Sequence, residues 1–218
     1  MQHSLVAEKV SKRMGKKELL RHVNLELTGG NIYGFTGENG SGKTMLFRVL
    51  CGLVRPSMGR VWMDGADVHR GSRKARTGVV LENPALWPEL TGRENLLYLS
   101  RISGVISASK VEETMGRVGL DPDNSLPFRK YSLGMRQRLL IAQAVMEEPD
   151  FLFLDEPTNS LDEEGVDLIR QIIAEEAERG AVVLLSSHIK QDISWLCNQV
   201  YSMENGTCSL AGGEVRGI

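Results

Sequence analysis

A glycine-rich stretch at residues 37–44 constrains the fold of this chain more than any other part of its sequence. It follows an apolar run at residues 32–35 and precedes apolar residues at helical spacing. Its sequence is Gly37-Glu38-Asn39-Gly40-Ser41-Gly42-Lys43-Thr44, and the helical residues are Leu46, Val49, Leu50 and Leu53. Closely spaced glycines let successive backbone N–H groups face one anion, and a helix N-terminus adds partial positive charge. The stretch therefore predicts a phosphate-binding loop between a strand and a helix.

The last residues of the loop indicate which phosphates and which metal it serves. Lys43 is expected to reach the β- and γ-phosphates of a nucleotide, and the Thr44 hydroxyl to ligate Mg²⁺. A chance glycine-rich turn that caps an ordinary helix is the alternative. The strand and helix patterns on both sides favour the phosphate-binding interpretation.

Polar residues follow two further buried strands of the expected sheet. Residues 151–154 form a continuous apolar run, typical of a strand covered on both faces, and Asp155 and Glu156 come next. Asp155 is expected to hold the same Mg²⁺, and Glu156 to take a proton from an attacking water. His188 follows the strand predicted at residues 182–185, so it is expected at the same sheet edge, within reach of the γ-phosphate. A solvated acidic pair and a structural histidine are the alternatives.

Composition limits the other classes of function. The 218 residues contain 26 Lys plus Arg against 28 Asp plus Glu, and this balance gives no support for nucleic-acid binding. A basic run at residues 69–76 has no interleaved aromatic residues and is interpreted as a solvated loop. The cysteines, Cys51, Cys197 and Cys208, lack metal-ligand spacing and are expected to be small, largely buried side chains in a reducing compartment. The longest apolar run, residues 181–185, is far short of the ~20 residues of a membrane helix.

The remaining patterns predict an α/β fold. Strands are expected at 4–10 and 22–27, joined by a basic turn at 12–17, and hairpins at Asp64-Gly65 and Asn205-Gly206. Thr91 with Glu94, Ser109 with Glu112 and Ser160 with Glu163 are predicted to cap helices, and a further helix follows Ser132. Three of these helices fall between residues 84 and 148, with Leu96, Leu97, Leu99 and Ile102 expected on the apolar side of the first.

Together, these residues resemble the nucleotide-binding subunits of ATP-binding-cassette (ABC) transporters over nearly the whole chain. Residues 37–44 are similar to the family's Walker A loop, 151–156 to its Walker B strand and catalytic glutamate, and 131–138 to its signature motif. Residues 159–162 resemble the D-loop, and Ser187-His188 the switch histidine. The resemblance implies a P-loop NTPase core of RecA type with an antiparallel β subdomain and an inserted α-helical subdomain. It divides a single domain of residues 1–218 into a core, 1–83 and 149–218, and a helical part, 84–148.

The resemblance also implies partners and a mechanism. Two such subunits close head to tail, so that ATP on Lys43 of one is covered by Ser132 and Gly134 of the other. ATP hydrolysis and dimer opening then drive membrane-spanning subunits between two states, which places the chain on the cytoplasmic face of a membrane.

The chain departs from the family pattern at three positions. Met14 stands where an aromatic residue commonly stacks on adenine, and Leu133 replaces the commoner glycine of the signature motif. Glu82 stands where most members place a glutamine that contacts Mg²⁺, and its charge is expected to strengthen metal dependence. An acidic residue there resembles the bacitracin and lantibiotic efflux or immunity subfamily.

Other functions remain as alternatives at this stage. A soluble cassette ATPase of the DNA-repair or translation-factor type is disfavoured. Those proteins resemble fused tandem cassettes or carry long coiled-coil insertions, and 218 residues leave room for neither. The three departures motivate a degenerate, nucleotide-sensing module, whereas Lys43, Asp155, Glu156 and His188 argue against it. No Asn-Lys-x-Asp motif for reading guanine is present.

Overall fold

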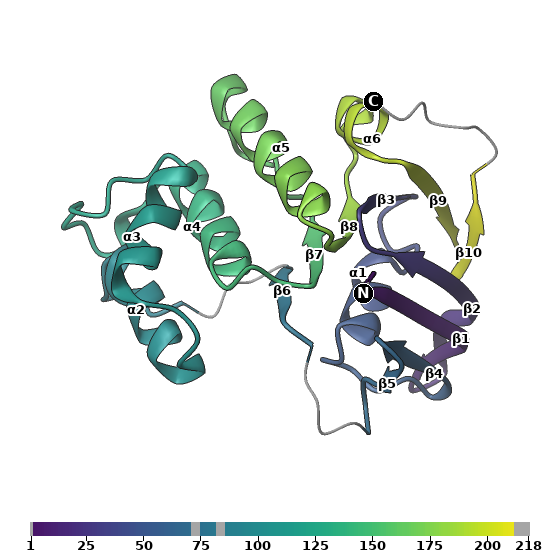
Figure 1. The fold of residues 1–218 in the computed structure, drawn as a ribbon. Coiled ribbons are helices and arrows are strands. Elements are labelled where there is room, and N and C mark those ends of the chain that lie inside the picture. Colours follow the sequence, from purple (N-terminus) through teal and green to yellow (C-terminus); the bar gives the residue numbers. More distant parts are fainter. Residues whose placement is uncertain (1, 71–74, 82–85, 212–218) are drawn as a thin grey trace.

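Two β-sheets and a set of helices build the fold of the computed structural model, which describes residues 2–70, 75–81 and 86–211 (Figure 1). The smaller sheet is antiparallel, with strand order β2-β1-β4-β5. In the larger sheet the order is β10-β9-β3-β8-β7-β6, where β6, β7, β8, β3 and β9 pair in parallel and β10 pairs antiparallel with β9. The strands are β1 Ser4–Met14, β2 Lys17–Thr28, β3 Asn31–Thr36, β4 Met58–Met63, β5 Ala66–Asp67, β6 Thr77–Val80, β7 Phe151–Asp155, β8 Val182–Ser186, β9 Gln199–Glu204 and β10 Thr207–Leu210.

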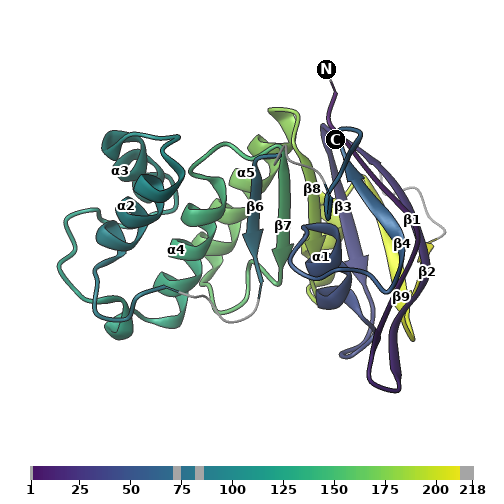
Figure 2. The same cartoon turned by 90° about the horizontal axis from the view of Figure 1, so that it is seen from below.

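The helices lie on both faces of the larger sheet. Helix α1 lies between the two sheets, and α5 packs on the opposite face of the larger one (Figure 2). The ring of Phe47 in α1 contacts Phe35 of β3 and Phe153 of β7, with ring centroids 5.3 and 6.0 Å apart. The helices are α1 Lys43–Leu50, α2 Gly92–Ser103, α3 Ala108–Arg117, α4 Leu133–Val145, α5 Glu163–Glu178 and α6 Lys190–Leu196, with a short 3-10 helix at Phe128–Lys130.

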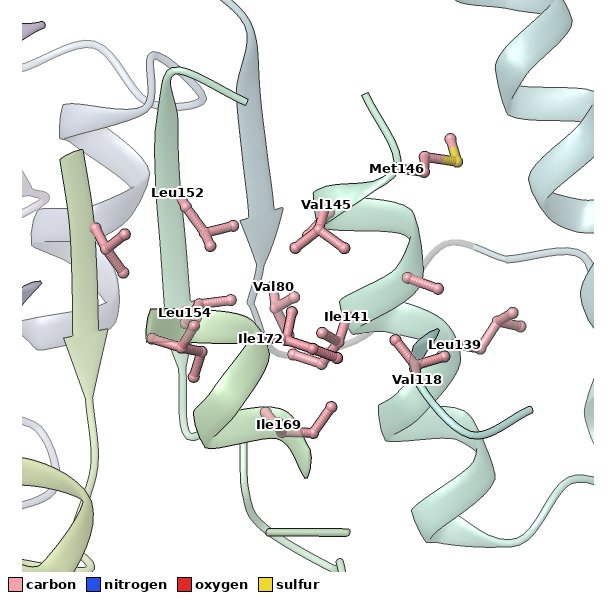
Figure 3. Packing of buried hydrophobic residues seen from close by; sticks show 14 of the residues in the cluster. Val80, Val118, Leu139, Ile141, Val145, Met146, Leu152, Leu154, Ile169 and Ile172 are labelled. Carbon is pink, nitrogen blue, oxygen red and sulfur yellow. The ribbon is translucent and has the colours of Figure 1, made fainter. Parts of the chain in front are cut away.

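Residues 151–154 of β7 and 182–185 of β8 are all apolar because both faces of these strands are covered. In β7, Phe151 and Phe153 pack with α1 and the antiparallel sheet, whereas Leu152 and Leu154 pack toward α4 and α5 (Figure 3). Successive side chains of a strand point to opposite faces, so a strand buried on both sides needs an apolar residue at each position. The prediction of a doubly covered strand at residues 151–154 is confirmed.

Helices α2, α3 and α4 follow β6 in the sequence and precede β7, and they form one end of the molecule (Figure 1). Their core is continuous with that of the sheet: Ile141 and Val145 of α4 lie beside Val80 of β6 (Figure 3). An α/β core with an antiparallel β part and inserted helices is therefore confirmed. The division at residues 84 and 148 stays a prediction.

Local signals correctly predict several turns and caps. Asp64-Gly65 and Asn205-Gly206 form the expected hairpin turns, with positive φ at all four residues. Thr91 and Glu94 form the predicted capping box of α2. Ser132 caps α4, and its Oγ accepts a hydrogen bond from Met135 N at 3.2 Å.

Two predicted caps are wrong by two residues. Helix α3 is capped by Ser107 rather than Ser109, and α5 by Asp162 rather than Ser160. In each case two side chains with suitable oxygens lie two positions apart, and the local pattern does not choose between them.

The other errors concern where elements end. Strands β1 and β2 continue through the predicted basic turn, and Met14 pairs with Lys17. Exposed charged residues in a hairpin that extends into solvent resemble a loop in sequence. Leu53 is 66% exposed because α1 ends at Leu50, and Ile102, expected on the apolar side of α2, is 70% exposed. Cys51 and Cys208 are partly buried and Cys197 is buried, as predicted.

Candidate functional site

The glycine-rich loop joins the end of β3 to the start of α1. Gly37 has φ +145°, and a Cβ there would lie 2.3 Å from the carbonyl oxygen of Met203. Gly42, which precedes the first residue of α1, has φ +114°, and its Cβ would lie 2.9 Å from Leu19 O. Both positions therefore require glycine, because a side chain would be strained and would clash with backbone. The loop leads directly into the N-terminus of α1, as the sequence predicts.

Polar groups within this loop retain capacity to bind a ligand. Lys43 is 7% exposed, and its Nζ donates hydrogen bonds to Gly37 O at 2.7 Å and Glu38 O at 3.2 Å. An ammonium group has three N–H donors, so one remains for an anion. Ser41 Oγ is buried and has no hydrogen-bond partner among the described residues. Buried polar atoms in native proteins are normally satisfied, and a phosphate oxygen fits this position.

Asp155 connects the loop to the ends of two neighbouring strands. One carboxylate oxygen accepts a hydrogen bond from Thr44 Oγ1 at 2.5 Å, and the other accepts from Ser186 Oγ. Asp155 and Ser186 are register partners at the carboxyl ends of β7 and β8. Hydroxyl and carboxylate oxygens are the ligands that Mg²⁺ prefers, so Thr44 and Asp155 fit the predicted metal. Glu82, the third predicted metal ligand, lies outside the described residues.

Glu156 has an unusual backbone and an unusual environment. Its φ is +53°, in the left-handed region that residues other than glycine seldom adopt. Its Oε2 accepts a hydrogen bond from the backbone N–H of His188 at 3.2 Å. Its Oε1 is buried and lies 3.3 Å from His188 Nε2, without the geometry of a hydrogen bond. Burial raises the pKa of the Glu156 carboxyl above its ordinary value, and the hydrogen bond from His188 N opposes that rise in part.

Lys43, Glu156 and His188, the predicted catalytic residues, line one cavity of about 620 Å³. Of the predicted glycine-rich loop, Asn39, Gly40, Gly42 and Thr44 also line it, whereas Gly37, Glu38 and Ser41 do not. His188 closes it on one side, with Nε2 3.1 Å from Asn39 Oδ1 of the glycine-rich loop. The structure thus brings together groups from the loop and from the ends of two strands. The cavity is lined by Lys17, Leu19, Asn39, Gly40, Gly42, Lys43, Thr44, Met45, Arg48, Val80, Leu81, Gln137, Leu140, Asp155, Glu156, Asn159 and His188.

Ser132 and Gly134 lie elsewhere on the surface. They line a separate hollow of about 590 Å³ with Leu133, at the N-terminus of α4. Leu133 is 67% exposed. Within one chain these residues therefore do not reach the cavity that Lys43 lines.

Met14 is not brought to the cavity either. It is 58% exposed at the end of β1, and Lys17, its partner in β2, lines the cavity instead. The assignment of Met14 to the adenine base stays a prediction, and Lys17 is a lining residue that the sequence reasoning missed.

Comparison with known protein families gives a match over most of the chain: residues 20–159 match the family described as ABC transporter. The chain belongs to the ABC transporter family. Its relatives include an uncharacterized ABC transporter ATP-binding protein, YybJ of Bacillus subtilis (strain 168), at 41% identity over 90% of this chain and 91% of YybJ. The bacitracin transport ATP-binding protein BcrA of Bacillus licheniformis is 37% identical over 90% of this chain and 65% of its own length. The chain thus spans just under two thirds of BcrA.

A second named relative and a solved structure extend the comparison. The lantibiotic transport ATP-binding protein SrtF of Streptococcus pyogenes is 33% identical over 94% of this chain and 89% of SrtF. The dimeric post-hydrolysis structure of the ATP-binding cassette MJ0796 with ADP and Pi matches with a TM-score of 0.86, at 24% identity, over 98% of this chain and 100% of that one. That likeness confirms the fold, and family membership establishes the chain as an ABC ATPase that binds ATP. Within the described residues, no helix is both long and apolar enough to cross a bilayer.

One further side chain of this ABC ATPase, Gln137, lines the cavity without having been predicted as a site residue. Gln137 lies in α4, lines the cavity, and its Nε2 donates a hydrogen bond to Pro157 O at 2.9 Å. It falls within the signature-like segment at residues 131–138, but nothing in that pattern indicates that it turns toward Glu156. The packing of α4 against the loop after β7 decides that contact.

Proposed function

We propose that this ABC ATPase supplies the energy for a membrane exporter of peptide antibiotics of the bacitracin or lantibiotic class. Two named relatives support the substrate class, one a bacitracin and one a lantibiotic transport ATP-binding protein. The acidic residue Glu82 supports the same class at the level of sequence. The chain would act at the cytoplasmic face of the membrane, bound to membrane-spanning subunits that carry the substrate path.

One observation carries the catalytic part of the proposal: Lys43, Glu156 and His188 line a single cavity at the N-terminus of α1. Lys43 and the backbone N–H groups of residues 37–44 would bind the β- and γ-phosphates of ATP, with Ser41 Oγ as a further donor. Glu156 would take the proton of the attacking water, for which its Oε1 has no competing hydrogen bond from the residues that the structure describes. His188 would hold the γ-phosphate through its ring and orient Glu156 through its backbone N–H.

Thr44, Asp155 and Glu82 would hold Mg²⁺. The ion would supply positive charge that offsets the charge of the phosphate oxygens. Thr44 and Asp155 already lie within hydrogen-bond distance of each other, so their oxygens can share one small cation.

A second cassette would complete the site. Ser132 and Gly134 stand at an exposed helix N-terminus, outside the cavity of their own chain. In a head-to-tail pair, these residues of one chain would cover ATP in the Lys43 cavity of the other, with the Ser132 hydroxyl and the helix N-terminus directed at the γ-phosphate. The partner cassette can be identical or different.

The catalytic assignment is tested by Glu156→Gln in the purified chain. We expect the rate of Mg-ATP hydrolysis to fall by about 100-fold or more, because the general base is lost. Equilibrium binding of ATP should persist, whereas Lys43→Ala should weaken it. Glu163→Gln, which alters an exposed acid in the first turn of α5, is the matched control and should retain the wild-type rate. Undiminished turnover by Glu156→Gln would contradict the assignment.

The transport assignment is tested in source cells. Tagged Glu156→Gln protein, extracted from membranes in mild detergent with Mg-ATP, should co-purify a protein with several membrane spans. Cells that lack the chain should become more sensitive to bacitracin or to a lantibiotic, and wild-type protein, but not Glu156→Gln, should restore resistance. Recovery of soluble or nucleic-acid partners alone, with unchanged sensitivity, would overturn the exporter proposal.

A further inference from the structure

A fully buried carboxylate lies next to the cavity without lining it. Asp192, in the first turn of α6, has an exposed fraction of 0% and is absent from the cavity lining. Its Oδ2 accepts hydrogen bonds from Thr158 Oγ1 at 2.6 Å and Ser187 Oγ at 2.9 Å. Its Oδ1 accepts from Arg170 of α5, from Nε at 2.9 Å and Nη2 at 2.6 Å.

This network is costly to disturb. A carboxylate removed from water is tolerated only when it is paired and its lone pairs are satisfied, and here four donors surround it. Thr158 and Ser187 are themselves 2% and 3% exposed, so water does not replace a lost hydroxyl readily. The positions of both hydroxyls are therefore fixed relative to Asp192.

The two hydroxyls belong to the two segments that carry the proposed catalytic groups. Thr158 follows Glu156 by two residues in the loop after β7, and Ser187 directly precedes His188 after β8. The left-handed backbone of Glu156 is unfavourable and persists only where its surroundings hold it. The hydrogen bond from His188 N to Glu156 Oε2 also requires that the two segments keep their spacing.

We propose that Asp192 is a positioning residue for ATP hydrolysis: it binds Thr158 and Ser187 and thereby holds Glu156 and His188 in their reactive geometry. The inference rests on the proposed roles of Glu156 and His188. It assigns no contact with ATP to Asp192.

A purely structural role is the competing explanation. Arg170 also lies over the ring of Trp195, 4.8 Å from its centroid, so Asp192 joins α5 to α6 as well. A structural role predicts lower stability and unchanged turnover at temperatures where the protein is folded. Glu176 provides a matched control, because it is 2% exposed, pairs with Arg179 at 2.8 Å, and does not line the cavity.

The test removes single hydroxyls and leaves the Arg170–Asp192 ion pair in place. Thr158→Val and Ser187→Ala should each lower kcat by about 10-fold or more, since small misplacements of catalytic groups are costly, while KM for Mg-ATP stays within about 2-fold. Thr158→Ser keeps the hydroxyl and should restore kcat. Glu176→Gln should lower the thermal midpoint and leave kcat unchanged.

Two further measurements separate the possible failures. In a Trp62→Phe, Trp87→Phe background, the emission of Trp195 should be the same with and without Thr158→Val, which shows that the contact between α5 and α6 is intact. If Glu156→Gln is inactive and both hydroxyl variants keep the wild-type kcat, the positioning role is overturned while the proposed function stands. If Glu156→Gln itself turns over at the wild-type rate, the proposed function fails first.

Discussion

Glu156 combines properties that fit catalysis and oppose stability. Its backbone φ is +53°, its Oε1 is buried with no hydrogen bond from any described part of the chain, and its carboxyl is largely withdrawn from solvent just after the end of β7. Such groups persist at active sites because surrounding contacts hold them. In this chain the hydrogen bonds from Gln137 Nε2 to Pro157 O, and from Thr158 to Asp192, hold the loop that follows.

The raised pKa of Glu156 has a consequence for stability. Because burial raises the pKa of the folded state, the carboxyl binds a proton more tightly in the folded than in the unfolded chain. The Glu156 carboxyl therefore contributes its full stabilisation at pH values below its pKa in the unfolded chain. That contribution is lost as the pH rises through its pKa in the folded protein. At neutral pH, the free energy of unfolding of Glu156→Gln should therefore be about 1 kcal/mol higher than that of the wild type.

That gain should shrink as the pH falls toward the ordinary range of a carboxyl group, where Glu156 becomes neutral like glutamine. Urea unfolding of the two proteins at several pH values measures it. A gain that grows on acidification would contradict the raised pKa.

At the scale of elements, the N-terminal cap of α3 can be tested directly. Ser107 Oγ accepts a hydrogen bond from Lys110 N at 3.3 Å and begins α3, whereas Ser109 is already inside the helix. The positions share a residue type and lie two residues apart, so they form a matched pair.

We expect Ser107→Ala to lower the free energy of unfolding by about 1 kcal/mol, because the cap is lost. Ser109→Ala should stay within about 0.5 kcal/mol of the wild type, as is usual for exposed sites. Chemical denaturation of both variants measures the difference. An effect of Ser109→Ala as large as that of Ser107→Ala would contradict the assignment of the cap to Ser107.

At the scale of the whole molecule, the catalytic cavity and the hollow around Ser132 are separate surfaces of one chain. Leu133, exposed by 67% between Ser132 and Gly134, can be changed without loss of packing. An acid at this first position of α4 is favourable to the helix, yet it would place a negative charge where the proposed partner's phosphates bind.

Leu133→Glu, introduced into Glu156→Gln protein, should abolish the dimer that forms with Mg-ATP and leave ATP binding by the single chain intact. Light scattering should report the 24.1 kDa monomer for this variant and twice that mass for the Glu156→Gln parent. Leu133→Gly removes the side chain without adding charge and should still dimerise. An ATP-bound dimer of the Leu133→Glu protein would contradict the proposed arrangement.

The sequence by itself determined the glycine-rich loop, the doubly buried strands, the order of elements and some of the groups that line the cavity, among them Lys43, Glu156 and His188. Those signals are local: backbone conformation requires glycine at Gly37 and Gly42, and burial on both faces requires apolar residues at positions 151–154 of β7. Only the tertiary structure decided which side chains meet. Thr44 and Asp155 are 111 positions apart, and Thr158 and Asp192 are 34 apart, so their hydrogen bonds depend on how strands and helices pack. The same packing brings Lys17 rather than Met14 to the cavity and pairs β9 in parallel with β3, because such contacts leave no periodic pattern in the chain.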